Sequence, residues 1–528
     1  MQSASVLRLP IVTRVDSRRP RVVEGWAWFA GSTALYLAAA VDLVLIRHAV
    51  LADALSRVAG SYFALYSRDP HLAAIGFVRM PLPSLLTLPL LPFKAVFPAL
   101  TQAGFAANII SALFMAGAVV QVDRILLDAH VERRLRLAVT ALFALQPMLI
   151  YAGANGGSQA ILLYFLLVAV RTLGQWFTRR DLLSLVLAGF ALAGAYLTGP
   201  EALPAAAGAA LLVAVTSFGP ARVDRAWAAA CDVAILVGPL AIAGATWIAA
   251  TWLITGDPFH QLSSVYSTGS EIQSLHSRGL DLGRDGPRAL ASLWRLLALA
   301  PGLPVALGVG AFALTRRRDP LLLIALGLLL PVVAVMLIAQ STGLVLLSLD
   351  GLIVAVPLTA LAAGIGVVSV SASERRFRGV LATIPLLIAL PSVVALVGFT
   401  NGALNRSGAV ATATSVSRDL DDRHLPAGSV MVDSFTGFAI VLESDNPRQF
   451  VITNDRDFRL ALTDPVGSDV QYLLVPAPGD PAALTTLDAL NRTYPALFNT
   501  GGGMATLVRE FDGGAGAPSW RLYRLIPN

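Results

Sequence analysis

Residues 320–339 read PLLLIALGLLLPVVAVMLIA, a run of apolar residues without a single charge. A helix of about 20 apolar residues crosses the hydrocarbon core of a bilayer, so this stretch predicts a transmembrane helix. The whole chain has the same character, since 56% of its 528 residues are hydrophobic and only 14% are charged. This composition excludes a soluble globular protein and indicates a multi-pass protein of the cell membrane.

Apolar blocks of similar length recur on both sides of this stretch and predict eleven spans, at 24–47, 103–123, 136–153, 158–176, 182–199, 201–218, 227–254, 291–314, 320–339, 344–369 and 379–400. Arginines gather in alternate connectors, at 124–136, 179–180, 222–225, 316–318 and 375–378. Because positively charged loops stay in the cytoplasm, this alternation predicts a cytoplasmic N-terminus. An odd number of spans then places residues 401–528 on the extracytoplasmic side.

The basic residues give no sign of a nucleic-acid partner. The formal net charge is +6, but the arginines lie between apolar blocks, where they orient helices next to membrane lipids, and do not form one basic face. Lys94 is the only lysine among 39 basic residues, which is typical of a GC-rich bacterial genome.

Two predicted outer segments are long, 48–102 and 255–290. In the first, the apolar run from Leu82 to Leu91 contains Pro83 and Pro89 and is flanked by Pro81 and Pro92. Proline breaks helices, so we interpret this run as short helices at the membrane interface. The alternative, a true span at 82–101, would invert every later loop and contradict the arginine alternation.

The composition changes after Asn401. Residues 401–528 contain 14 acidic and 10 basic residues, against a basic excess in residues 1–400. Short β-rich runs occur at 429–433, 438–442, 449–453, 470–475, 505–511 and 520–526, with helical patterns at 411–424 and 481–497. Strands interleaved with helices predict a small soluble α/β domain after an all-α membrane domain at 1–400. The sequence has no internal repeat, metal-type His/Cys spacing, Walker motif or Rossmann fingerprint.

The first outer segment contains the candidate chemistry, in residues 51–93, LADALSRVAGSYFALYSRDPHLAAIGFVRMPLPSLLTLPLLPF. Asp53 follows the first span, and Arg57 lies four residues later on the same helical face. An acid at the water boundary can act as general base on a hydroxyl, and nearby arginines can bind a lipid phosphate as leaving group. The alternative is an ion pair at a helix end with no catalytic part. Further polar residues follow in this segment, namely Tyr62, Arg68, Asp69 and His71.

This segment resembles the first extracytoplasmic loop of the GT-C glycosyltransferases, the polyprenyl-phosphate-sugar-dependent enzymes related to protein mannosyltransferases and aminoarabinose transferases. The resemblance, of an actinobacterial type, rests on Asp53, Tyr62 and Met80-Pro81-Leu82-Pro83. It continues at Gln146-Pro147, at Tyr151–Asn155 and at Thr255–Phe259 with Ser263–Tyr266. It implies that Asp53 is the catalytic base and Asp69 a second acid. Residues that would contact donor or acceptor are Arg57, Tyr62, Arg68, His71, Glu201, Asp257, His260, Tyr266 and Asp350.

The chain also departs from the family pattern. Asp53 is flanked by Ala52 and Ala54 instead of a second acid, and the fourth span begins with Ser158-Gln159 where an acid is common. Thr198–Glu201 lacks the usual arginine, and Leu347–Gly351 lacks the usual basic and aromatic residues. These departures are also consistent with a non-catalytic relative of the family.

Several of these residues have simpler interpretations. Glu201 fits an interfacial cap, Gly256-Asp257-Pro258 is a good turn on its own, and Asp350 would be a costly buried acid about two helical turns below the outer surface.

Two functions follow as predictions. The first is a membrane glycosyltransferase that moves a sugar from a polyprenyl-phosphate donor to an envelope glycan, lipid or protein acceptor on the outer side of the membrane. For this function the sequence predicts no certain cofactor and no metal ligand. It does not decide whether the reaction requires a divalent cation. The alternative is a non-catalytic polytopic protein, either a transporter or a cell-envelope assembly scaffold. Transporters usually show internal repeats around a midplane site, whereas the polar residues here lie at the outer boundary.

Overall fold

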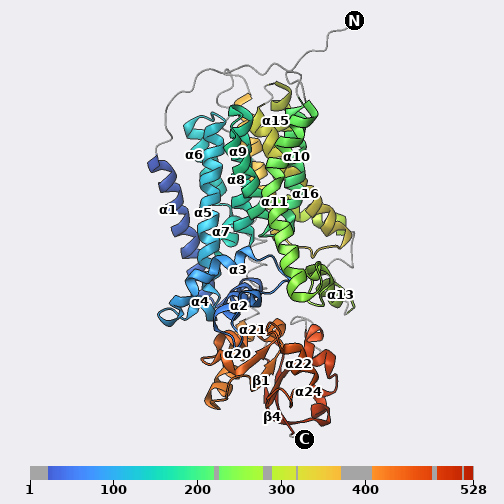
Figure 1. Ribbon diagram of the computed structural model, residues 1–528. Coiled ribbons are helices and arrows are strands. Elements are labelled where there is room, and N and C mark those ends of the chain that lie inside the picture. The colour runs from blue at the N-terminus through green and yellow to red at the C-terminus, as the bar shows by residue number, and fades with distance from the viewer. Residues whose placement is uncertain are drawn as a thin grey trace.

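The computed structural model describes residues 22–218, 225–277, 288–316, 319–369, 407–478, 485–513 and 517–526. Its first part is a bundle of apolar helices (Figure 1). The main helices are α1 Val22–Ala40, which continues into the π-helical turn η1 Val41–Ile46, α5 Phe105–Asp128, α6 Arg133–Ala144, α7 Pro147–Ala154, α8 Gln159–Arg179, α9 Leu182–Tyr196, α10 Leu203–Ser217, α11 Arg225–Thr255, α14 Arg288–Leu299, α15 Leu303–Arg316, α16 Pro320–Thr342 and α17 Ala355–Gly366. Within the described ranges, six helical segments are long and apolar enough to cross a membrane, or eight if each of two bent pairs is one span.

Most predicted spans correspond to these helices, but two of them bend sharply. Helices α6 and α7 meet at 57°, and α14 and α15 meet at 76°. In both pairs a proline, Pro147 or Pro301, stands at or beside the break, and proline cannot continue the backbone hydrogen bonding of a helix. The predicted span 344–369 also begins later than expected, with the short turn η5 Asp350–Leu352 before α17. The predicted span 379–400 lies outside the described residues.

Ion pairs connect helices at one end of the bundle, and the pair between Arg136 and Asp123 is buried. Arg136 contacts Glu24 of α1 at 2.7 Å and Asp123 of α5 at 3.3 Å. Arg171 of α8 contacts Asp128 of α5 at 3.0 Å. The start of α1, the end of α5 and the start of α6 therefore lie together, as the alternation of arginine clusters predicts.

The opposite end of the bundle consists of short helices. These are α2 Ala52–Tyr66, η2 Leu72–Ile75, α3 Leu82–Thr87, η3 Leu88–Ala95 and α4 Ala99–Gln102. The apolar run that begins at Leu82 is thus a series of short helices, as its prolines predict, and no single helix covers 82–101. Two further short helices, α12 His260–Ser263 and α13 Thr268–Ser277, follow α11.

The C-terminal domain is built on a five-stranded sheet in the order β2-β1-β3-β5-β4. Strands β1, β2 and β3 are parallel, whereas β5 pairs antiparallel with β3 and β4. The strands are β1 Val430–Val432, β2 Phe450–Ile452, β3 Tyr472–Pro476, β4 Ala505–Phe511 and β5 Trp520–Leu525, and the helices are α20 Ser407–Asp422, α21 Ser434–Glu443, α22 Phe458–Thr463, α23 Ala489–Thr493 and α24 Leu497–Thr500. This confirms the α/β architecture of the C-terminal part; the predicted boundary at residue 401 lies outside the described residues.

Alternate residues of the central strands enter two different cores. Val430 and Val432 belong to a hydrophobic cluster that continues into the membrane helices, while Met431 belongs to a second cluster on the other face of the sheet. Both faces of these central strands are therefore buried, which is why their sequences are short, continuously apolar runs. The run Phe438–Leu442 is an exception, because it forms part of α21 and not a strand.

The C-terminal domain packs against the end of the bundle that contains α2 and α4 (Figure 1). Helix α21 contacts both of these short helices. The carboxyl ends of the parallel strands therefore lie beside the two long outer segments predicted from sequence, and both segments contact them.

Candidate functional site

Helix α2 presents Asp53 and Arg57 one turn apart on one face. Arg57 Nη2 lies 2.7 Å from Asp53 Oδ2, which confirms the contact predicted from the spacing. The other carboxylate oxygen, Oδ1, accepts a hydrogen bond from Arg79, which stands just before Pro81. Both oxygens of Asp53 are thus paired with a guanidinium, and the carboxylate is half-buried.

The Arg57 guanidinium is buried, and part of its hydrogen-bonding capacity is unused. Nη2 donates to Ser158 Oγ at 3.0 Å, whereas Nε and Nη1 have no partner. Burial lowers the pKa of Arg57 to about 10, and the negative charge of Glu201 opposes this shift. The side chain therefore stays cationic at neutral pH. Leaving donors of a buried cation unpaired is costly, so this geometry suits an anionic ligand.

The turn between α7 and α8 forms the wall beside Arg57. Gly156 has φ +76°, and a Cβ at this position would lie 2.8 Å from the Ala54 side chain of α2. Only glycine allows this turn to approach α2 so closely. The turn also places the buried atoms Asn155 Nδ2 and Gln159 Oε1 here without hydrogen-bond partners.

Glu271 of α13 comes from the second outer segment and reaches the same cluster. Its Oε1 lies 4.0 Å from Arg79 Nη2, so Arg79 stands between two carboxylates, Asp53 and Glu271. Burial raises the pKa of Glu271, and the charge of Arg79 opposes that shift. We refer to Asp53, Arg57, Arg79, Ser158 and Glu271 as the Asp53 cluster.

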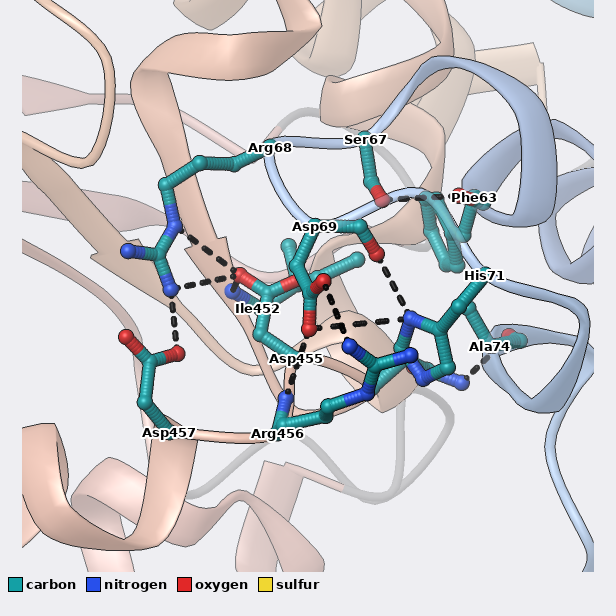
Figure 2. A network of polar contacts seen from close by, with 11 residues as sticks. Phe63, Ser67, Arg68, Asp69, His71, Ala74, Ile452, Asp455, Arg456 and Asp457 are labelled. Carbon is teal, nitrogen blue, oxygen red and sulfur yellow. Dashed lines mark hydrogen bonds and ion pairs between the residues drawn. The ribbon is translucent and has the colours of Figure 1, made fainter.

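Arg68, Asp69 and His71 face the C-terminal domain, as Figure 2 shows. Arg68 Nε donates to Asp455 Oδ2 at 3.3 Å, and its Nη2 donates to Asp457. Asp69 Oδ2 accepts from the backbone N–H of Arg456 at 3.2 Å.

His71 Nδ1 lies 2.6 Å from the backbone oxygen of Asp69 in the same network, and Asn454 Nδ2 donates to the Ala74 oxygen at 2.8 Å. Asp69 and Asp53 thus have separate sets of partners, and the role of Asp69 as a second acid stays a prediction.

Tyr62 lies within the short helices and is almost fully buried. Its hydroxyl contacts Lys94 Nζ at 3.0 Å, and the ammonium also lies 4.2 Å from the centre of the Tyr66 ring. Burial raises the pKa of Tyr62, so the hydroxyl keeps its proton. This ammonium–tyrosine contact holds η3 against α2.

Tyr266 points into the C-terminal domain. Its hydroxyl donates to Asp433 Oδ2 at 2.9 Å, and its ring lies over Phe435 with the ring centres 4.7 Å apart. The sequence did not reveal this contact, because nothing local relates residue 266 to residue 433.

The remaining predicted residues are more dispersed. Asp257 accepts from the Phe259 backbone N–H at 2.9 Å and from Ser263, so it stabilises the turn before α12, and the hydrogen bond from Ser263 lowers its pKa. His260 begins α12, and burial lowers its pKa. Glu201 lies in the turn η4 Pro200–Ala202 before α10, near enough to Arg57 to act on its charge. Asp350 begins η5, and its buried Oδ1 has no hydrogen-bond partner.

Among the described residues, no group of three or more histidine, cysteine, aspartate or glutamate side chains could hold a metal ion. Arg79 and Glu271 were not recognised from the sequence. Arg79 directly precedes the proline-leucine motif at Met80–Pro83, so the sequence analysis of that motif could have identified it. Glu271 belongs to a short polar helix with no motif, and only the fold brings it to Arg79.

The solved structures similar to this chain include two of ArnT from Cupriavidus metallidurans. The structure bound to undecaprenyl phosphate has a TM-score of 0.53 and 14% identity, and the match covers 94% of this chain and 98% of that chain. The apo structure has a TM-score of 0.53 and 15% identity, with 95% and 98% covered. No family model and no curated protein sequence matches the chain. The similarity shows that nearly the whole chain has the fold of these ArnT structures, in agreement with the fold predicted from the sequence.

Proposed function

We propose that this chain is a membrane glycosyltransferase that moves a sugar from a polyprenyl-phosphate donor to a hydroxyl of an envelope glycan, lipid or protein. The proposal includes eleven spans, a cytoplasmic N-terminus and an extracytoplasmic domain at 401–528. It is supported by the fold, which is similar to that of a protein bound to undecaprenyl phosphate, a polyprenyl phosphate. The arginine alternation and the ion pairs at the end of the bundle away from the C-terminal domain support the orientation.

The observation that best supports the proposal is the unpaired side of the Arg57 guanidinium. Nε and Nη1 are both buried and lack partners, and they stand beside an acid whose own oxygens are occupied by cations. A phosphate group carries negative charge and several acceptor oxygens, so it can accept hydrogen bonds from these unpaired guanidinium N–H groups. We therefore assign the donor phosphate to Arg57, with Arg79 as a second cation.

Phosphate binding at Arg57 would also activate Asp53. In the structure, both Asp53 oxygens accept from arginines, which makes the carboxylate a weak base. A donor phosphate that also binds Arg79 displaces Asp53 Oδ1 from that guanidinium and so frees one oxygen of Asp53. The freed carboxylate then accepts the proton of the acceptor hydroxyl while the acceptor oxygen bonds to the sugar carbon. The bond from that carbon to the phosphate oxygen breaks, and the polyprenyl phosphate leaves with its charge held by Arg57.

The other predicted contacts divide into two groups in this proposal. Glu201 and Asp350 stay candidate substrate contacts, because Glu201 acts on Arg57 and Asp350 has a free buried oxygen. Arg68, Asp69 and Tyr266 contact the C-terminal domain, and we assign them to holding that domain over the outer segments. His71 contacts Asp69, and we assign it to orienting that residue. Asp257 and His260 belong to the turn before α12.

The test is the Asp53→Asn variant, which keeps the size of the side chain and removes the proton acceptor. Transfer from a polyprenyl-phosphate sugar should fall by roughly 10²–10⁴-fold, the usual contribution of a positioned base. Asp42→Asn is the matched control, because Asp42 also pairs with an arginine, Arg47, at 2.8 Å, but on the exposed surface. The control should keep its activity and yield.

Two outcomes would contradict the proposal. If Asp53→Asn lowers the yield while the purified protein transfers sugar normally, Asp53 is only a structural ion-pair partner. If the wild type transfers no sugar from a panel of polyprenyl-phosphate donors, the non-catalytic alternative is the better account, since the paired state of Asp53 is also what a scaffold protein would show.

A further inference from the structure

The side chain of Tyr266 occupies the place where a sheet of this kind usually holds a ligand. The strand order β2-β1-β3 means that the chain leaves β1 toward one neighbour and later returns on its other side. Ligands of open α/β sheets bind at such a switch point, outside the carboxyl ends of the strands. Asp433 directly follows β1 at that point, and the residue that reaches it is Tyr266 from the second outer segment.

Asp433 is built to hold this hydroxyl. It is fully buried, and Oδ1 accepts from the Phe435 backbone N–H at 2.8 Å and from Thr453 Oγ1 at 2.7 Å. Oδ2 accepts from the Ala489 backbone N–H at 2.7 Å and from Tyr266 at 2.9 Å. Three segments of the C-terminal domain thus fix the carboxylate, and the outer segment supplies the fourth donor. Burial and the charge of Asp433 raise the pKa of Tyr266, so its hydroxyl stays a donor.

A short, hydrogen-bonded path connects Tyr266 to the Asp53 cluster. The Ser267 backbone N–H donates to the Ser264 oxygen at 2.9 Å, and the Glu271 N–H donates to the Ser267 oxygen at 3.0 Å. These bonds join the turn that contains Tyr266 to the first turn of α13. Glu271 then faces Arg79 at 4.0 Å. A displacement of Tyr266 would therefore be transmitted to Glu271.

We propose that Tyr266 and Asp433 form a latch through which the C-terminal domain positions Glu271 against Arg79. Glu271 is then a positioning residue, because it orients the guanidinium that Asp53 must release when donor phosphate binds. The latch itself is independent of the activity, whereas its effect on catalysis rests on the function proposed above. In this proposal the C-terminal domain contributes to the geometry of the Asp53 cluster.

The first experiment measures position without any need for activity. The full-length protein first receives Cys231→Ser, which removes the native cysteine. Arg79→Cys and Glu271→Cys are then introduced, and the two new thiols are cross-linked with a short bismaleimide. Adding Tyr266→Phe keeps the ring over Phe435 but removes the hydroxyl, and cross-linking should slow several-fold. Tyr494→Phe is the matched control, because it removes a hydroxyl that donates at 2.6 Å to Leu462 within the C-terminal domain. Equal cross-linking rates in the Tyr266→Phe and control proteins would overturn the latch.

The second experiment tests the consequence for transfer, with the native Arg79 and Glu271 in place. Tyr266→Phe and Glu271→Gln should each lower kcat about tenfold with little change in the KM for donor, below the roughly 100-fold that a displacement of about 1 Å can cost. The double variant should be no slower than the slower single variant, because both act through the same contact. Additive losses, or an unchanged kcat in Tyr266→Phe, would overturn the positioning role. If the wild type is inactive, the proposed function fails, and the cross-linking result alone decides the latch.

Discussion

Replacing Arg57 by methionine should weaken the binding of undecaprenyl phosphate without harming the fold. Methionine keeps the length of the apolar stem but removes the charge and all five N–H donors. Two of the nitrogens, Nε and Nη1, are buried and unpaired in the structure, so they are free to bind phosphate oxygens. A hydrogen bond that involves a charged group contributes about 1.5–3 kcal/mol.

The variant loses two such bonds to phosphate, and loss of the contact between Arg57 and Asp53 partly offsets their effect on binding. The net loss of binding free energy is about 3 kcal/mol, which corresponds to a roughly 100-fold increase in Kd. Arg57→Lys keeps the charge but not the planar fork, so we expect a roughly tenfold increase. Stability should change little, because Asp53 keeps Arg79 as a partner and the variant removes donors that are already unsatisfied.

The assay is the titration of detergent-solubilised protein with undecaprenyl phosphate, followed by native mass spectrometry or calorimetry. Arg47→Met is the matched control, because Arg47 pairs with Asp42 at 2.8 Å on the exposed surface and should not contribute to binding. If Arg57→Met binds undecaprenyl phosphate within about twofold of the wild type, Arg57 is not the phosphate ligand and the reasoning from its unpaired nitrogens is wrong.

Two further predictions concern stability. Gly156→Ala should lower the melting temperature and weaken donor binding, because φ is +76° and the new Cβ would lie 2.8 Å from Ala54. Gly238→Ala, within helix α11 and with nothing within 4 Å, should leave donor binding unchanged and not lower the melting temperature. Burial raises the pKa of Asp455 to about 6 and, with the neighbouring Asp433, that of Asp488 to about 8. The folded state therefore binds more protons than the unfolded chain between about pH 4 and 8, and the C-terminal domain should lose stability as the pH rises through this window, by up to about 3 kcal/mol for Asp455. Unfolding of this domain, followed by hydrogen exchange at pH 5 and pH 8, measures the difference, and greater stability at pH 8 would contradict it.

Local patterns predicted the parts of this fold that depend on local physics. The spacing of Asp53 and Arg57 predicted their contact because residues four apart meet on one helical face. The strands of the C-terminal domain were predicted because they are short runs rich in β-branched, aromatic and other apolar residues. The run Phe438–Leu442 was read as a strand because a short apolar run has no clear period. Asp433 instead accepts from the Phe435 N–H and begins a helix there.

The rest depended on contacts between distant segments. Apolar composition predicts that a segment crosses the membrane, but it does not predict the bends after α6 and α14. Glu271 had no sequence signal, since its contact with Arg79 requires two outer segments to fold toward each other. Tyr266 was recognised as notable, but only the structure places its hydroxyl at Asp433.

A structure of the full-length protein determined with bound undecaprenyl phosphate tests the central claim most directly. We expect a phosphate oxygen within about 3 Å of Arg57 Nε or Nη1, the ordinary length of such a hydrogen bond. In the present structure Asp53 is paired with both Arg57 and Arg79. In the lipid-bound structure we expect at least one Asp53 oxygen to be released from its arginine and free to accept a proton. A phosphate bound elsewhere, with Asp53 still held by both arginines, would contradict the assignment of the Asp53 cluster as the site of sugar transfer.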